Sequence, residues 1–305
     1  MNETPNTRTA EHFDAMVATY ETWAEPRTAG LAKAALKRTS VRAGDSVLDI
    51  GAGTGALALQ AAALGARVTA IDLSTAMVAR LTQRLAPYPE CKALVMDGQA
   101  LTFEESTFDA AFCVLSTTLF PDWRAGLDEA VRIVRPGGWI GIVHWASPQG
   151  SDVFTIFSRA LKKLALPTDS PDAPKLTELS AHELRAALED RKCEVMEVEL
   201  LDAPGPFPTP EKFMDTLDPF YRIHPTYRSL DERLRGELGK VLAEEAHRWI
   251  KEDVPAGRTA KAHLAIARRL FRPVDQLVSE MERGIGRSPA SRQAKVPTIV
   301  VPQGP

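Results

Sequence analysis

A short glycine-rich segment is the part of this sequence whose residue types and spacing most clearly permit chemistry. Residues 47–55 read VLDIGAGTG, with glycines at positions 51, 53 and 55. Glycine has no side chain and adopts positive φ easily, so such a turn lets a ligand approach the backbone closely. The spacing G-x-G-x-G differs from the G-x-G-x-x-G of dinucleotide sites, which disfavours a nicotinamide cofactor. We therefore expect a ligand-binding turn at Gly51, Gly53 and Gly55.

A carboxylate follows the next apolar run. Residues 67–71 read RVTAI, and Asp72 comes directly after them. An acid at this position of an open α/β sheet can accept hydrogen bonds from ribose hydroxyls, and bonds to a charged acceptor are the stronger kind. Asp72 thus indicates an adenosine-containing ligand but does not say which one. The structural alternative is an acid placed at a helix N-terminus, where the helix dipole favours it.

The elements that must position these residues alternate between short apolar strands and amphipathic helices. Strands are expected at residues 46–50, 67–71, 93–96, 108–115 and 139–144, with helices at 56–64, after Ser74, and at 123–134. This alternation is typical of a doubly wound parallel sheet, which binds ligands outside the carboxyl ends of its strands. Helices are also expected within residues 11–39, a sixth strand at 193–200, a helix around 230–242, and a strand or helix at 260–268, where the alternation favours a strand.

Composition narrows the class of partner. The 305 residues include 37 Lys and Arg against 40 Asp and Glu, a net charge of −3, so no broad positive surface for nucleic acid is expected. Cys91, Cys113 and Cys193 are odd in number and widely spaced, which favours free thiols in a reducing compartment over a disulfide framework or a metal site. Residues 1–10 lack the apolar run of a signal peptide. We expect a cytoplasmic protein without a membrane segment.

Five segments in order resemble a known family. VLDIGAGTG, AIDLS, VMDGQAL, FDAAFCVL and RIVRPGG are similar to the motifs of class I S-adenosylmethionine-dependent methyltransferases, closest to the ubiquinone and menaquinone biosynthesis C-methyltransferase-like branch. The resemblance covers residues 13–145, and residues 260–268 resemble the family's last strand. Residues 147–257 match no motif of the family, so the acceptor, its acceptor atom and the pathway are not indicated.

The resemblance implies S-adenosyl-L-methionine as the cofactor and assigns residues to it. The glycine turn would contact the methionine part, Asp49 would help to hold the amino group, and Asp72 would bind the ribose. Asp97 would bind the adenine amino group, and residues 114–116 would face the transferred methyl. The complete set implied for the cofactor is Tyr20, Asp49, Gly51, Ala52, Gly53, Gly55, Asp72, Leu73, Met77, Asp97, Gly98, Gln99, Val114 and Leu115.

The implied function is methyl transfer to an oxygen, nitrogen or carbon nucleophile of a small-molecule, secondary metabolite. His144 is the candidate general base, with a hydrogen-bonded structural histidine as the alternative. Tyr221, His224 and Tyr227 are candidates for substrate binding or for packing within their lobe. No metal site is expected, and the oligomeric state is left open. The alternative function is a binding protein, or a non-methylating enzyme that retains the cofactor structurally.

The expected fold class is α/β: a Rossmann-like, doubly wound seven-stranded sheet with N-terminal helices and a helical lid insertion. Within it we expect N-terminal helices forming a cofactor lid at residues 1–45, the cofactor-binding core at 46–146, a substrate lid with the sixth strand at 147–258, the last core strand at 259–272, and a C-terminal helix with a mobile tail at 273–305.

Overall fold

A computed structural model describes residues 5–146, 152–168, 177, 179–222, 224–251 and 260–271 of the chain. The chain divides into two compact units, Met1–Leu270 and Phe271–Pro305. The first unit holds every element described below. The expected C-terminal helix and mobile tail at residues 273–305 lie outside the described residues, as do residues 147–151 at the start of the expected substrate lid.

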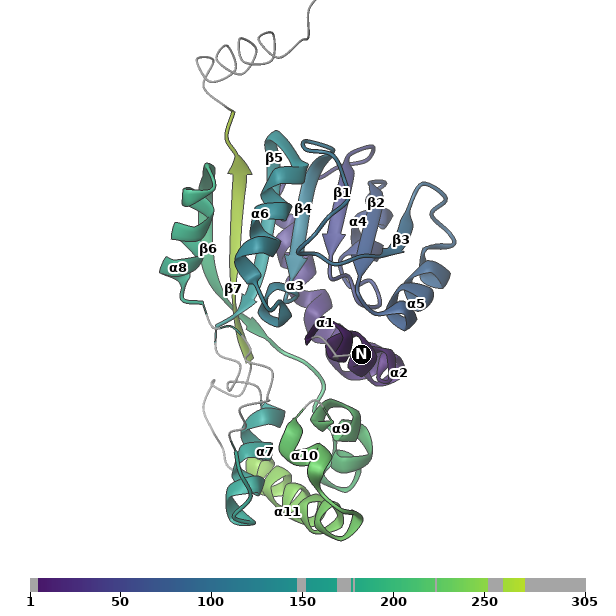
Figure 1. Cartoon of the computed structure of the whole chain (residues 1–305), viewed down its shortest axis with the longest axis vertical. Coiled ribbons are helices and arrows are strands. Elements are labelled where there is room, and N and C mark those ends of the chain that lie inside the picture. The colour runs from purple at the N-terminus through teal and green to yellow at the C-terminus, as the bar shows by residue number, and fades with distance from the viewer. Residues whose placement is uncertain are drawn as a thin grey trace, which may run out of the picture. The chain divides into compact units, whose positions relative to one another are not determined.

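Seven strands form one mixed sheet (Figure 1). They are β1 (Ser46–Ile50), β2 (Arg67–Asp72), β3 (Lys92–Val95), β4 (Phe108–Val114), β5 (Val134–Trp145), β6 (Cys193–Ala203) and β7 (Ala260–Arg269). The strand order is β3-β2-β1-β4-β5-β7-β6. Neighbours among β1 to β5 pair in parallel, whereas β7 pairs antiparallel with both β5 and β6. The expected seven-stranded α/β fold is confirmed, including a strand at residues 260–268.

Helices cover both faces of the sheet because strand side chains alternate between the faces. Val47 and Ala110 belong to one buried cluster, together with residues of α3 (Glu25–Lys37), α4 (Ala58–Ala63) and α5 (Thr75–Leu85). Leu48 and Ala111, the next residue in each strand, belong to a second buried cluster. That cluster includes residues of α6 (Trp123–Ile133) and α8 (Ala181–Asp190). Burial on both faces explains why the central strands are nearly continuous apolar runs.

The N-terminal segment is helical and is tied to α5. It comprises α1 (Pro5–Asp14), the short α2 (Val17–Thr19), a π-helix at Tyr20–Ala24, and α3. Arg80 of α5 makes an ion pair with Glu21 at 2.7 Å, and Arg84 pairs with Glu25 at 2.6 Å. Arg84 also donates to the backbone oxygen of Thr54 at 2.8 Å. These contacts connect the N-terminal helices to the glycine turn.

Four further helices form a layer of their own near the ends of the strands (Figure 1). They are α7 (Asp152–Lys163), α9 (Phe213–Tyr221), α10 (Pro225–Ser229) and α11 (Glu232–Lys251), with a short 3-10 helix at Pro210–Lys212 before α9. A third buried cluster, which includes Phe157, Phe213 and Leu238, holds them together. This layer has its own core, built from buried residues of α7, α9, α10 and α11 together with Leu230.

The strand β5 starts earlier than expected. Residues 135–138 were expected to form a turn after a helix, but β5 begins at Val134 and includes them. The pairing of β4 with β5 shifts register between Phe108 and Ala110, and Gly137 has a φ of +78°. A bulge in the strand therefore accommodates the Pro-Gly-Gly sequence, as bulges often do where a glycine adopts positive φ.

Candidate active site

A cavity of about 740 Å³ lies where the strand order reverses between β1 and β4. This volume is within the range of roughly 300–1,000 Å³ typical of ligand sites. Residues that follow β1, β2, β3 and β4 line it, together with side chains of α1, α7 and α9. It is therefore the position at which an open α/β sheet binds its ligand.

The glycine turn forms part of the cavity wall. Gly51 and Gly53 have φ values of +71° and +54°. The backbone nitrogens of Gly51 and Ala52 donate to the oxygen of Ile71 at 2.8 and 2.9 Å, which ties the turn to the end of β2. A Cβ atom on Gly51 would lie 2.3 Å from the Cβ atom of Ser116. Close approach of β4 therefore requires glycine at position 51.

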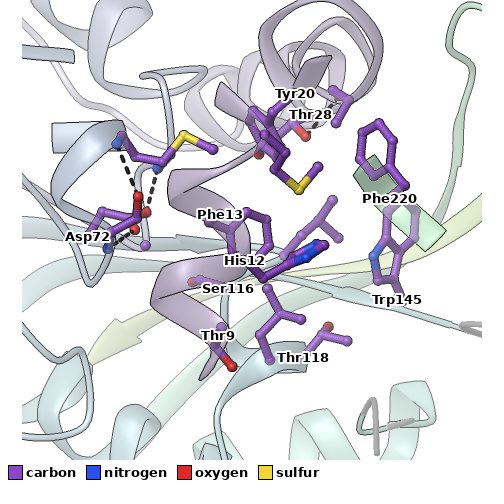
Figure 2. A pocket seen from close by; sticks show the side chains of 18 of the residues that line it. Thr9, His12, Phe13, Tyr20, Thr28, Asp72, Ser116, Thr118, Trp145 and Phe220 are labelled. Carbon is purple, nitrogen blue, oxygen red and sulfur yellow. Dashed lines mark hydrogen bonds between the residues drawn. The ribbon is translucent and has the colours of Figure 1, made fainter. Parts of the chain in front are cut away.

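Asp72 lies at the end of β2 and lines the cavity. Its carboxylate accepts hydrogen bonds from the backbone nitrogens of Gly53 at 2.8 Å and Ser74 at 2.9 Å, as Figure 2 shows. Burial raises the pKa of Asp72 above its usual value, and the backbone N–H groups of Ser74, Gly53 and Leu73 oppose this rise. A carboxylate has about four lone-pair positions, so Asp72 retains accepting capacity for a ligand.

Asp97 follows β3 and lines the same cavity with Gly98 and Gln99. One carboxylate oxygen accepts bonds from the backbone and side-chain nitrogens of Gln99 at 2.9 and 3.1 Å. The other oxygen accepts a bond from the Asn6 amide of α1 at 2.7 Å. Asp97 is thus fixed from within its own turn and also contacts the N-terminal helix.

One face of the N-terminal helix covers the cavity. Asn6, Thr9, Ala10 and Phe13 all line it, and their spacing places them on a single helical face. At the end of α1, Asp14 accepts bonds from the hydroxyl of Ser74 at 2.5 Å and the backbone nitrogen of Ala76 at 2.9 Å, at the start of α5.

Tyr20 lies next to the glycine turn. A Cβ atom on Gly53 would lie 3.2 Å from the Tyr20 ring, and both residues line the cavity. Burial raises the pKa of Tyr20 to about 12, so its phenol stays protonated at neutral pH. Tyr20 begins the π-helix, and π-helical turns are frequently found at functional sites.

Most of the residues that the resemblance assigns to the cofactor line this cavity. They are Tyr20, Gly51, Gly53, Asp72, Leu73, Met77, Asp97, Gly98, Gln99, Val114 and Leu115. Asp49, Ala52 and Gly55 are not among its lining residues. Asp49 is 2% exposed and accepts a bond from the backbone nitrogen of Ala58 at 3.0 Å, so it supports the turn from behind. Burial raises the pKa of Asp49 to about 7.

His144 is not among the residues that line the cavity, and its role as a general base stays a prediction. Its side chain is fully buried. Its two ring nitrogens contact the hydroxyl of Thr117 at 3.0 Å and the backbone oxygen of Thr177 at 2.7 Å. Burial lowers its pKa to about 4, so the ring is neutral at neutral pH. The ring nitrogen that contacts Thr117 also lies 3.4 Å from the hydroxyl of Thr118, a residue that lines the cavity, so His144 lies directly behind the cavity wall.

Tyr221 and Tyr227 also lie elsewhere than expected. Both are buried in the core of the helical layer, where Tyr221 stacks on Phe157 with ring centroids 4.3 Å apart. The Tyr221 hydroxyl donates to the oxygen of Val153 at 3.0 Å, and the Tyr227 hydroxyl donates to Asp218. Both tyrosines thus lie at positions that fit the packing alternative, whereas His224 lines the cavity; the roles of all three stay predictions.

A group of aromatic residues that the sequence did not single out lines part of the cavity. Its members are Trp145, Phe154, Phe157 and Phe220, and Trp23 also lines the cavity. In Figure 2, Trp145 and Phe220 lie on one side of the cavity and Asp72 lies on the other. Aromatic residues in predicted helices and strands are common core residues, so the sequence does not distinguish those that reach the cavity, such as Phe220, from the fully buried Tyr221. The helical spacing of Asn6, Thr9 and Phe13, by contrast, could have indicated the lining face of α1.

Two further observations concern other classes of site. Among the described residues, no group of three or more His, Cys, Asp or Glu side chains is arranged to hold a metal ion. No helix in that part of the chain combines the length and apolarity needed to cross a bilayer.

Comparison with known proteins agrees with the geometry. A family model described as a methyltransferase domain matches residues 47–138. Demethylmenaquinone methyltransferase of Corynebacterium kroppenstedtii is 33% identical over 163 residues, an alignment that covers 52% of this chain and 69% of that protein. Alignments with other curated relatives cover less, between 46% and 54% of their length.

Two solved structures share the fold. One is a putative methyltransferase of Bacillus halodurans, with a TM-score of 0.51 at 18% identity, covering 79% of this chain and 99% of that one. The other is the [4+2]-cyclase SpnF, with a TM-score of 0.52 at 19% identity, covering 80% of this chain and 82% of that one. At these identities the likeness concerns the fold alone.

Proposed function

The chain belongs to the S-adenosylmethionine-dependent methyltransferases of the menaquinone- and ubiquinone-like branch, and we propose that it transfers a methyl group from S-adenosylmethionine to a small-molecule acceptor. The observation that carries this proposal is the grouping of Gly51, Gly53, Asp72 and Asp97 around one cavity at the carboxyl ends of β1 to β4. The two glycines suit the methionine part of the cofactor, Asp72 suits the ribose, and Asp97 suits the adenine.

The residues fit the cofactor in three places. The carboxylate of Asp72 has free accepting capacity for the ribose hydroxyls, and Asp97 with Gly98 offers an acceptor and an open surface for adenine. The turn at Gly51 and Gly53 leaves space for the methionine part, because the backbone there carries no side chain. Asp49 lies just behind this turn, where its charge favours a nearby ammonium group.

The reaction asks little of the protein's side chains. The sulfonium of S-adenosylmethionine supplies an activated methyl group when it is bound. The protein must hold an acceptor in line with that methyl and exclude water, and alignment alone can lower a barrier by roughly 7–11 kcal/mol in favourable cases. The side chains of α1, α7 and α9 that line the cavity are suited to this task, because they enclose it beyond the sheet.

We propose a small-molecule acceptor because side chains enclose the cavity beyond the sheet. The cavity is bounded by side chains of the N-terminal helices and the helical layer, so its size limits what can enter beside the cofactor. The net charge of −3 argues against a polyanionic substrate. A cytoplasmic location remains an expectation from the composition.

Calorimetric titration with S-adenosylmethionine and S-adenosylhomocysteine tests the proposal, with NAD as the negative control. We expect micromolar binding of the first two ligands and no heat from NAD. Absence of binding by either sulfur ligand would refute the cofactor assignment. Binding without methyl transfer to any of a broad set of acceptors would instead favour the alternative, a protein that retains the cofactor for another purpose.

A further inference from the structure

One buried carboxylate lies outside the candidate cofactor site yet contacts the glycine turn. Glu25 begins α3 and is 8% exposed. Its two oxygens accept hydrogen bonds from the Arg84 guanidinium, from Nη1 at 2.6 Å and from Nη2 at 2.9 Å. One of these oxygens also accepts a bond from the hydroxyl of Thr54. A buried charge is costly unless it is paired and hydrogen-bonded, so the loss of one partner disturbs the positions of the others.

Thr54 connects this carboxylate to the turn. It lies between Gly53 and Gly55 and is fully buried. Glu25 binds its hydroxyl, and Arg84 donates to its backbone oxygen at 2.8 Å. The glycines on either side have φ values of +54° and +108°, and glycine can leave such conformations easily. The ion pair therefore restrains the turn by holding both the side chain and the main chain of the residue between the two glycines.

The same carboxylate helps to place Tyr20 against the turn. Glu25 directly follows the π-helix that Tyr20 begins. Tyr20 forms a hydrogen bond with Thr28, in the first turn of α3 (Figure 2). A Cβ atom on Gly53 would lie 3.2 Å from the Tyr20 ring, and both residues line the part of the cavity proposed for the methionine part of the cofactor. A shift at the start of α3 would therefore move a wall of that part of the cavity.

The ion pair itself lies away from the ligand. Glu25 and Arg84 are not among the described residues that line the large cavity, and both line a separate, smaller cavity of about 360 Å³. The acids proposed to bind the adenosine part are Asp72 and Asp97. Among the described residues, only Gly53 of the turn bonds to either of these acids. An effect of Glu25 on a bound ligand must therefore pass through the turn and its neighbours, which the two parts of the ligand use unequally.

We propose that Glu25, acting through Arg84 and Thr54, is a positioning residue that keeps the glycine turn and Tyr20 in the geometry that binds the methionine part of the cofactor. This inference rests on the proposed function for the identity of the ligand. Loss of the Glu25 carboxylate then weakens ligands that carry the methionine part and spares ligands that lack it. A purely structural ion pair would instead change both affinities alike, or change only the stability of the fold.

The test compares two ligands that share an adenosine and a thioether. S-adenosylhomocysteine carries the amino and carboxylate groups of the methionine part, and methylthioadenosine lacks them. Dissociation constants of both are measured calorimetrically on the full chain. We expect Glu25→Gln, which removes the charge at nearly constant size, to weaken S-adenosylhomocysteine about tenfold and methylthioadenosine less than about twofold. Thr54→Val, which removes the hydroxyl at nearly constant shape, should also weaken S-adenosylhomocysteine, whereas Thr54→Ser, which keeps the hydroxyl, should bind it like the wild type.

The matched control is Asp109→Asn, at the amino end of β1. Asp109 also pairs with an arginine and a hydroxyl, namely Arg135 at 2.7 Å and the hydroxyl of Ser46 at 2.8 Å. Its loss should lower the stability of the fold, measured by thermal unfolding, and leave both affinities unchanged.

Two results would overturn the role of Glu25 while the proposed function stands. They are equal weakening of both ligands by Glu25→Gln, and an unchanged affinity of the folded variant for S-adenosylhomocysteine. If Glu25→Gln does not fold, or if methylthioadenosine binds too weakly to measure, the Thr54 variants decide: equal affinities of Thr54→Val and Thr54→Ser for S-adenosylhomocysteine would overturn the inference. If the wild-type protein binds neither ligand, the proposed function fails and this inference fails with it.

Discussion

Replacing Asp72 with asparagine removes the negative charge from the cavity while keeping the size of the side chain. In the free protein, the Asp72 carboxylate accepts two backbone N–H bonds, from Gly53 at 2.8 Å and Ser74 at 2.9 Å. About two lone-pair positions remain for the two ribose hydroxyls of the cofactor. The change from a charged to a neutral acceptor lowers the value of each such bond by about 1 kcal/mol.

Two bonds weakened in this way predict a loss of about 2 kcal/mol, or roughly 30-fold in the dissociation constant of S-adenosylhomocysteine. Titration calorimetry measures this directly, and thermal unfolding of the ligand-free variant checks that it is folded. Asp128→Asn is the matched control, because it makes the same charge change on α6 at a side chain that is 61% exposed. An unchanged affinity in Asp72→Asn, with a folded protein, would refute the ribose assignment.

Three other predictions address the turn, its supporting acid and His144. Gly53→Ala places a Cβ atom 3.2 Å from Tyr20 at a φ of +54° and should weaken S-adenosylhomocysteine binding tenfold or more, by roughly 1.4 kcal/mol or more. Gly236→Ala is the control, because a Cβ atom there meets open space and should leave the affinity unchanged. Equal affinities of the two variants in a titration would contradict the turn model. Burial raises the pKa of Asp49 to about 7, so binding of the cofactor's ammonium group nearby should release about half a proton from Asp49 at pH 7. Titrations in buffers of different ionisation enthalpy measure the number of protons released. Proton release that persists in Asp49→Asn would show that Asp49 is not its source. Burial lowers the pKa of His144 to about 4, so below pH 6.5 the unfolded state binds more protons than the folded state and stability falls. His144→Phe should therefore reduce the loss of unfolding free energy between pH 7.5 and pH 5 by about 2 kcal/mol, measured by urea unfolding. The same pH dependence in both proteins would show that the His144 ring is not buried in its neutral form.

The parts of the fold and site that depend on local sequence could be predicted. The run from Ser46 to Ile50, followed by the alternating glycines, specifies a strand and a turn through a few neighbouring residues, and the structure has both. A helix was expected directly after Ser74, and the Ser74 hydroxyl caps it by accepting a bond from the nitrogen of Met77 at 3.1 Å.

The parts that depend on how a helix or strand is rotated in the fold could not be predicted. Phe220 and Tyr221 are neighbours on α9, yet the first lines the cavity and the second is buried in the core. Consecutive helical residues point about 100° apart, and the sequence of α9 is apolar enough on both sides to allow either orientation. The surroundings of His144 could not be predicted for a similar reason, because its ring nitrogens contact partners from two distant segments, at 117 and 177.

The contact between Asn6 and Asp97 has a consequence for the speed of ligand association. The amide of Asn6 donates to the same carboxylate that is proposed to receive the adenine amino group. Incoming adenine must therefore share this oxygen or displace the amide, and displacement breaks the hydrogen bond between the first turn of α1 and Asp97. The association rate would then follow the opening rate of α1 and saturate at high ligand concentration, whereas in Asn6→Ala it would rise linearly towards the diffusion limit.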